Sequence, residues 1–132
     1  MAATIEGRDR ELIEQPNFCM VATLRPDGTP HVTPTWVDYD GEHILLNSAE
    51  GRSWPENIRR DSRVTLTILN MENPYEYLSI RGRLADDTHE GAREQINRLA
   101  KKYMDKDEYP GPADEVRVIF KIEPLEVRRF GS

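Results

Sequence analysis

The side chains best suited to chemistry gather in the segment NSAEGRS, residues 47–53, where an expected strand turns into a short helix. A turn of this kind points backbone N–H groups and a helix start at one place, which favours an anion. Ser48 and Ser53 add hydroxyl donors, and Arg52 adds a positive charge, so a phosphate could be held here by charge-assisted hydrogen bonds. An ordinary strand-to-helix turn with a solvated arginine explains the same residues equally well.

A second unusual segment is HVTPTWV, residues 31–37. Pro34 removes a backbone donor from an expected strand, so it marks an edge or a bulge, and bulges often lie beside ligands. There Thr33 and Thr35 would offer hydroxyls and Trp36 a flat surface. Taken alone, the pattern favours an edge strand with Trp36 in the core.

Other kinds of chemistry find little support in the sequence. His31, His43 and His89 lie in different segments without metal-binding spacing, so we expect surface histidines and no metal site. No serine lies in a Gly-x-Ser-x-Gly elbow, and neither a phosphate-binding P-loop nor a Rossmann glycine motif is present. Cys19 lies within an apolar run and is expected to be a buried packing residue.

Composition limits the class of protein and its partners. The chain has 132 residues, 37% of them hydrophobic, and a formal net charge of −6. We therefore expect one globular domain over residues 1–132. The acidic balance argues against nucleic acid as a partner, and no apolar run suits a membrane span or a signal peptide. The expected location is cytoplasmic, and a local basic site for a small anion stays open.

The elements that must position these residues follow from periodicity and turn residues. Helices are predicted over residues 8–15, 54–60 and 88–104, and strands over 17–24, 30–39, 42–48, 63–69, 77–86 and 116–123. The first three strands should form a meander. Ser53 and Glu56 have the spacing of a capping box for the second helix, and Pro124 should end the last strand. Six or more antiparallel strands with short helices predict a mainly β fold that closes into a small barrel.

The order of these segments resembles a known family. Residues 21–52, 57–66, 73–84 and 100–127 are similar to the pyridoxamine phosphate oxidase-like flavoproteins, in particular the branch that uses the deazaflavin coenzyme F-420. The resemblance covers about residues 14–130. It implies a six- or seven-stranded antiparallel split β-barrel of the FMN-binding type. It also implies a homodimer with two cofactor sites shared between the subunits.

The resemblance also implies which residues bind the cofactor. Residues 33–36 would lie along the tricyclic ring, and Tyr75 and Tyr77 would reach the partner subunit's site. The residues that would flank the phosphate or ring are Asn47, Ser48, Ala49 and Arg52. Arg59, Arg60 and Arg63 would pair with Asp61 or face solvent. The full set of expected cofactor-binding residues is Thr33, Pro34, Thr35, Trp36, Asn47, Ser48, Ala49, Arg52, Ser53, Trp54, Asn57, Tyr75 and Tyr77.

The chain departs from the resemblance at the helix start. Relatives usually carry lysine where this chain has Trp54, and often a basic residue where it has Glu56. The loss of two cations weakens the attraction for an anion. Trp54 would either stack on the ring of the cofactor, a contact of roughly 1 kcal/mol, or pack against the protein.

Three functions follow from the resemblance. The first is a coenzyme F-420-dependent oxidoreductase that transfers a hydride to a conjugated small molecule, with the cofactor supplying the redox chemistry. The second is an FMN-dependent enzyme of the pyridoxamine phosphate oxidase-like class. The third is a non-catalytic flavin-binding or carrier protein, because a fold alone does not fix a function. No residue stands out as the proton donor.

Overall fold

Seven strands form one antiparallel sheet in the computed structural model, which describes residues 2–131. The order of strands across the sheet is β2-β1-β5-β6-β7-β4-β3. Along the chain the elements are α1 (Gly7–Glu14), β1 (Cys19–Leu24), β2 (Pro30–Thr35), β3 (Asp38–Tyr39), β4 (Ile44–Ala49), α2 (Ser53–Arg60), β5 (Arg63–Leu69), β6 (Tyr77–Thr88), α3 (Ala92–Met104) and β7 (Arg117–Phe130). The predicted mainly β, antiparallel split barrel with short helices is confirmed.

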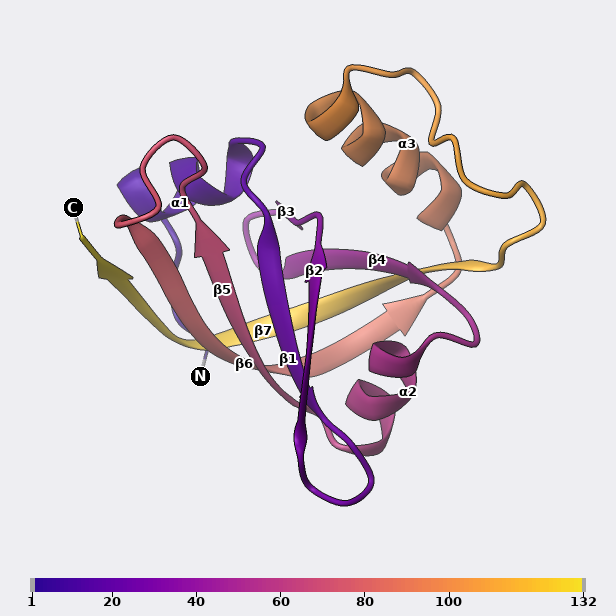
Figure 1. Ribbon diagram of the computed structural model, residues 1–132, viewed down its shortest axis with the longest axis horizontal. Coiled ribbons are helices and arrows are strands. Elements are labelled where there is room, and N and C mark those ends of the chain that lie inside the picture. The colour runs from indigo at the N-terminus through magenta and orange to yellow at the C-terminus, as the bar shows by residue number, and fades with distance from the viewer. Residues whose placement is uncertain (1, 132) are drawn as a thin grey trace.

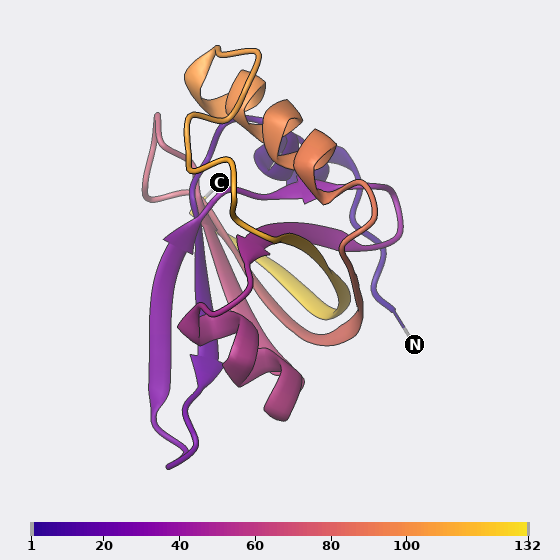
Figure 2. The same cartoon turned by 90° about the vertical axis from the view of Figure 1, so that its right-hand side faces the viewer.

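The sheet curls around a single apolar core. In Figure 1, α1 and α3 lie above the strands and α2 lies at the lower right, and Figure 2 shows the β1–β2 hairpin extending down past α2. Val64, Leu66 and Ile68 of β5 are buried in this core, as their alternation predicts. Cys19 is also fully buried, and burial raises the pKa of its thiol. The expectation of a packing cysteine is therefore confirmed.

The predicted strand over residues 30–39 is interrupted in the structure. β2 ends at Thr35 and β3 begins at Asp38, and the two lie at opposite edges of the sheet. The predicted three-stranded meander is therefore wrong. β2 pairs only with β1, whereas β3 pairs with β4, which pairs in turn with β7. Trp36 and Val37 form the link that crosses between the two edges.

Pro124 does not end the last strand, contrary to the prediction. β7 continues to Phe130 along β6, and the register shifts between the pairs Arg81–Glu126 and Gly82–Pro124. The missing proline N–H is tolerated because the extra residue forms a bulge there. A Cβ at Gly82 would lie 2.8 Å from the carbonyl oxygen of Glu123, so glycine is needed where the strands close up.

Two helix starts also differ from the prediction. Arg52 precedes α2 in an extended conformation and Ser53 is already helical, so its hydroxyl makes no capping bond and the predicted capping box is wrong. α3 begins at Ala92 rather than Thr88, because β6 continues through Thr88 and Gly91 turns the chain with φ 76°. No helix within residues 2–131 combines the length and apolar character needed to cross a bilayer.

One face of the strands β2, β1, β5 and β6 carries no helix. Its residues follow from the registers, because Met20, Ala22 and Leu24 of β1 stand opposite Pro34, Val32 and Pro30 of β2. Val32 is 54% exposed. On the same face Tyr77 of β6 stacks on Phe130 of β7, with ring centroids 5.1 Å apart. We call this surface the open face of the sheet.

Candidate cofactor site

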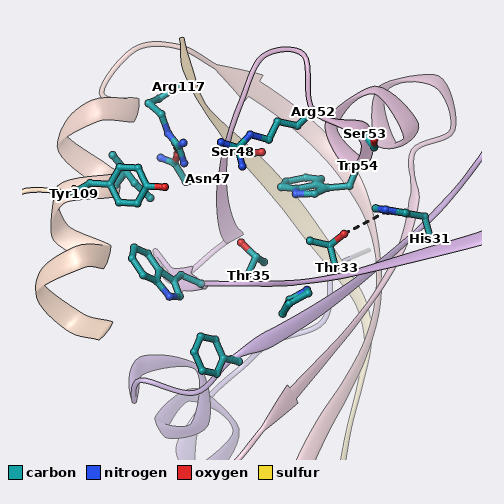
Figure 3. Close-up of a pocket in the computed structure, with 14 residues that line it drawn as sticks. His31, Thr33, Thr35, Asn47, Ser48, Arg52, Ser53, Trp54, Tyr109 and Arg117 are labelled. Atoms are coloured by element: carbon teal, nitrogen blue, oxygen red, sulfur yellow. Dashed lines mark hydrogen bonds between the residues drawn. The ribbon is translucent and has the colours of Figure 1, made fainter. Parts of the chain in front are cut away.

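A pocket of about 460 Å³ lies between β2, the turn from β4 into α2, and the start of β7 (Figure 3). Its volume falls in the range of roughly 300–1,000 Å³ usual for small-molecule sites. The residues that line it are Phe18, His31, Thr33, Pro34, Thr35, Trp36, Asn47, Ser48, Arg52, Ser53, Trp54, Ile96, Tyr109 and Arg117. Segments that are distant in the sequence therefore form one concave surface.

Most of the expected cofactor-binding residues meet at this pocket. The nine that line it are Thr33, Pro34, Thr35, Trp36, Asn47, Ser48, Arg52, Ser53 and Trp54. Ala49 is buried beside them, and Tyr75 and Tyr77 lie elsewhere, on the loop before β6 and on β6 itself. Tyr75 is 84% exposed, so it is free to reach another molecule.

Asn57 belongs to the packing of α2 and not to the pocket. Its amide donates to Thr23 Oγ1 at 3.2 Å, and its oxygen accepts from Arg60 at 2.8 Å. It lines a neighbouring cavity of about 240 Å³, together with Arg25, His31 and Ser53. The two cavities share His31 and Ser53, so the smaller one adjoins the larger.

An aromatic wall closes one side of the pocket. Trp36 stacks on Tyr103 with ring centroids 5.2 Å apart, and Tyr109 meets the indole edge-on at 5.9 Å. Phe18 also stacks on Tyr103, with ring centroids 5.9 Å apart. The indole is held by rings from α3 and the following loop, so its flat face is a fixed part of the site.

The backbone beside Trp36 is fixed from α3 as well. Val37 N donates to Tyr103 Oη at 3.2 Å, and that hydroxyl donates to the carbonyl of Asn17 at 2.6 Å. Lys102 Nζ donates to the carbonyls of Ile13 and Val37 at 2.6 and 2.7 Å. Burial lowers the pKa of Lys102 to about 8, although the negative charges of Asp38 and Glu14 act to raise it.

Trp54 combines two roles. Its side chain is 5% exposed and packs in the core against Phe120, with ring centroids 4.9 Å apart. The same indole also lines the pocket (Figure 3). Packing against the protein, one of the two alternatives raised by the sequence, therefore explains why an aromatic residue stands at this helix start.

The polar end of the pocket contains a residue that the sequence analysis missed. Arg117 of β7 is buried, donates from Nε to Asn47 Oδ1 at 2.9 Å, and lies over the ring of Tyr109 at 5.0 Å. Asn47 in turn donates to Gln95 Oε1 at 2.6 Å and to the carbonyl of Ala92 at 2.9 Å. A charge inside the apolar run VRVIF was the signal that could have found Arg117.

The arginines of α2 and its surroundings do not all face the pocket. Arg52 lines it and pairs with Glu115 at 2.8 Å. Arg59 pairs with Glu50 and Asp87, and Arg63 pairs with Asp61, as expected for Arg63. Arg60 donates to the carbonyl of Leu24 and to Asn57. Of these four arginines, Arg52 alone lines the pocket, and the other three make contacts within the protein.

His31 was expected on the surface, but it lines the pocket. It lies on β2, two residues before Thr33, whose hydroxyl is 3.5 Å from His31 Nδ1. The alternation of β2 directs His31, Thr33 and Thr35 to the same side. Within residues 2–131, no group of three or more histidine, cysteine or acidic side chains is placed to hold a metal ion.

Comparison with known proteins agrees with this geometry. Residues 5–131 match the sequence profile of the family described as pyridoxamine 5'-phosphate oxidase. The chain belongs to the pyridoxamine 5'-phosphate oxidase-like family. Proteins of this family bind flavin-type cofactors. No curated protein sequence matches the chain.

Solved structures share the fold of this pyridoxamine 5'-phosphate oxidase-like chain. An F420 reductase from Mycobacterium smegmatis is 30% identical with a TM-score of 0.83, and the alignment covers 94% of this chain and 98% of that one. A conserved hypothetical protein from Mycobacterium tuberculosis is 21% identical with a TM-score of 0.72, over 99% and 88%. A Listeria innocua protein is 22% identical with a TM-score of 0.70, over 92% and 94%. The last two show the fold alone.

The residues present fit a flavin-type cofactor. Such a cofactor has a flat tricyclic ring and an anionic tail, and the pocket offers a fixed indole together with two arginines, Arg52 and Arg117. Ser48 of β4 and Ser53, the first residue of α2, also line the pocket and add hydroxyl groups. A helix start and charged donors together favour a phosphate.

Proposed function

We propose that the protein is a coenzyme F-420-dependent oxidoreductase that reduces a conjugated small molecule. The observation that carries the proposal is the pairing, in one pocket, of the fixed Trp36 wall with the cationic end at Arg52 and Arg117. The F420 reductase from Mycobacterium smegmatis, 30% identical over nearly its whole length, adds support. The deazaflavin supplies the hydride when it is bound.

The protein's part in this function is to hold and orient. Trp36 and Tyr109 would confine the ring from two directions, because their planes are nearly perpendicular at 87°. Arg52 and the start of α2 would hold the phosphate. Thr33 and Thr35, on the β2 side of the pocket, would donate hydrogen bonds to polar atoms on the ring. A ring fixed in this way would increase the rate of hydride transfer, because it would hold the cofactor in a constant orientation relative to the substrate.

The test is a cofactor titration in which binding is measured by the quenching of Trp36 and Trp54 fluorescence. The proposal predicts tighter binding of coenzyme F-420 than of FMN, followed by turnover of a conjugated acceptor. Tighter FMN binding, or release of FMN from the denatured protein, would favour the FMN-dependent enzyme instead. Saturable binding without turnover across a broad panel of acceptors would favour the carrier.

We also propose that the protein is a homodimer joined through the open face of the sheet. This face carries Val32, Leu24 and the Tyr77–Phe130 stack without a covering helix. The registers also place the exposed Thr65 and Arg81 on this face, so the proposed interface combines apolar contacts with polar ones. Pro34 lies on the same face and also lines the pocket, so a second subunit there would complete the walls of the site.

A further inference from the structure

Two arginines of the pocket share one carboxylate oxygen. Glu115 Oε2 accepts from Arg52 Nη2 at 2.8 Å and from Arg117 Nη1 at 3.0 Å. Glu115 stands at the end of the loop before β7, and Arg117 is the first residue of that strand. The three side chains form a unit with two positive charges and one negative charge.

Much of this unit is removed from water. The side chain of Arg117 is 6% exposed and that of Glu115 is 12% exposed. Burial lowers the pKa of Arg117 even though Glu115 raises it, so the carboxylate does not fully compensate for the lost hydration. A buried charge is costly unless it is paired. The buried members, Arg117 and Glu115, pair with each other, whereas the second positive charge is on Arg52, whose side chain is 54% exposed.

Arg117, which lines the pocket, has unused hydrogen-bonding capacity. Arg117 Nη2 has no hydrogen-bond partner among residues 2–131, and Nε is held by Asn47, so the guanidinium is fixed while one of its ends is free. Glu115 Oε1 is buried and, within the same residues, accepts no hydrogen bond. The pocket side of the unit thus offers donors with a fixed direction to an acceptor.

We propose that Arg117 and Arg52 together bind one oxyanion of the pocket's ligand, and that Glu115 is the internal counter-ion that competes with this oxyanion. The inference deepens the proposed function and rests on it. The oxyanion comes either from the phosphate of the cofactor or from a carboxylate of the substrate. In both cases Glu115 sets the affinity, because an incoming anion must share the arginines with a fixed negative charge.

The proposal is tested with inorganic phosphate at constant ionic strength, by isothermal titration calorimetry. Glu115→Gln removes the competing charge and should tighten phosphate binding by about three- to tenfold. Arg117→Met should weaken it by about tenfold or more, the scale of a lost charged hydrogen bond. The matched controls are Glu123→Gln and Arg83→Met. These two residues form an ion pair, with Arg83 Nε 2.7 Å from Glu123 Oε1, and neither lines the pocket, so both substitutions should leave the phosphate affinity unchanged.

The opposite signs make the proposal falsifiable even if Arg117→Met does not fold, because Glu115→Gln then decides alone. Unchanged or weaker phosphate binding by Glu115→Gln would overturn it and leave Glu115 as a structural tie. FMN and riboflavin, which differ by the phosphate, separate the two sources. Loss of the preference for FMN in Arg117→Met assigns the oxyanion to the cofactor, whereas an unchanged preference assigns it to the substrate.

Failure of the proposed function gives a different result. Tighter phosphate binding by Glu115→Gln, in a protein that binds no coenzyme F-420, would retain the oxyanion site and reject the function. Coenzyme F-420 affinity that is insensitive to both Glu115→Gln and Arg117→Met, with phosphate binding equally insensitive, would retain the function and reject the site.

Discussion

The indole of Trp36 lies parallel to the phenol ring of Tyr103, with ring centroids 5.2 Å apart and an angle of 6° between the planes. The same phenol accepts a hydrogen bond from the N–H of Val37, the residue after Trp36. One side chain of α3 therefore fixes both the ring of Trp36 and the backbone that carries it.

Two substitutions separate these contributions of Tyr103. Tyr103→Phe keeps the stack but leaves Val37 N–H and the Asn17 carbonyl unpaired, and should lower the free energy of unfolding by about 1–3 kcal/mol. Flavin affinity should change less than about twofold. Tyr103→Ala also removes the stack, so we expect flavin binding to weaken by about tenfold or more. Equal flavin affinity of the two variants, measured by fluorescence titration, would show that Tyr103 does not position Trp36.

Substitution of Trp54 tests the packing role of its indole. Trp54→Lys would place a charge against Phe120 in the core, and loss of the ring alone costs about 3–5 kcal/mol. We therefore expect a large drop in the urea midpoint, which would mask any gain in anion affinity. Trp54→Phe is the control and should lose less stability. A Trp54→Lys protein of wild-type stability that binds flavin more tightly would show that the indole merely occupies the place of a cation.

Lys102 predicts a pH dependence of stability in the alkaline range. The pKa of Lys102 is about 8 in the folded protein because of burial, and its ordinary value is 10.5. Between these values the unfolded chain binds the proton more strongly, so this residue's contribution to the free energy of unfolding rises with pH. Below pH 8 both states are protonated, and the unfavourable contribution stays constant.

The measurement compares wild type with Lys102→Met by urea unfolding between pH 7.5 and 10. The stability of the wild type relative to the variant should increase across this range. Using the difference removes most of the opposite contribution of Cys19, whose thiol has a raised pKa. Tyr103 also has a raised pKa, so the comparison stops at pH 10. A constant difference would mean that Lys102 titrates normally.

Glu76 predicts a loss of stability in acid. Its carboxylate accepts two hydrogen bonds from Arg8, at 2.9 and 2.6 Å, and one from Asn70 at 2.9 Å, and these lower its pKa to about 2. The stabilisation is complete above the ordinary value near 4.5 and declines as the pH falls toward 2. Glu76→Gln should be less stable than wild type at pH 7, and the gap should narrow in acid. Thermal unfolding at several pH values checks this, and a pH-independent gap would contradict it.

The open face predicts the oligomeric state. Light scattering at micromolar concentration should give about twice 15.3 kDa. Val32→Glu, on the edge strand β2 of this face, should give the monomer mass and weaken flavin binding. Val116→Glu is the matched control for the dimer mass, because Val116 is also 54% exposed but lies just before β7, away from this face. A wild-type monomer, or a dimer that tolerates Val32→Glu, would place the interface elsewhere or remove it.

The alternation of apolar and polar residues predicted those strands whose side chains are buried on one face only. The alternation of Val64, Leu66 and Ile68 gave β5 correctly, because period-two burial is a direct consequence of the strand geometry. The break after Thr35 could not be predicted in this way. Val37 is held by Tyr103 and Lys102, which lie more than sixty residues away in the sequence, and no local signal reports such contacts.

The candidate site shows the same division. The turn at Ser48–Ser53 and the β2 residues were found because their own segments are unusual, with a proline in a strand and donors at a helix start. Tyr109 and Arg117 were missed because the sheet order brings them to the pocket, through the pairing of β4 with β7. Arg117 stands opposite Ala49 only in that register, and a one-residue shift would turn it away.

The strand order also determines when the site can exist during synthesis. β4 pairs with β3 and β7, and β3 pairs with β4 alone, so neither joins the main sheet before β7. Contacts between such distant segments form late, because long loops must close first. A nascent chain that ends before Arg117 therefore has the β1–β2 hairpin but lacks the β7 side of the pocket, and a premature stop at or before codon 117 would remove that wall of the candidate site.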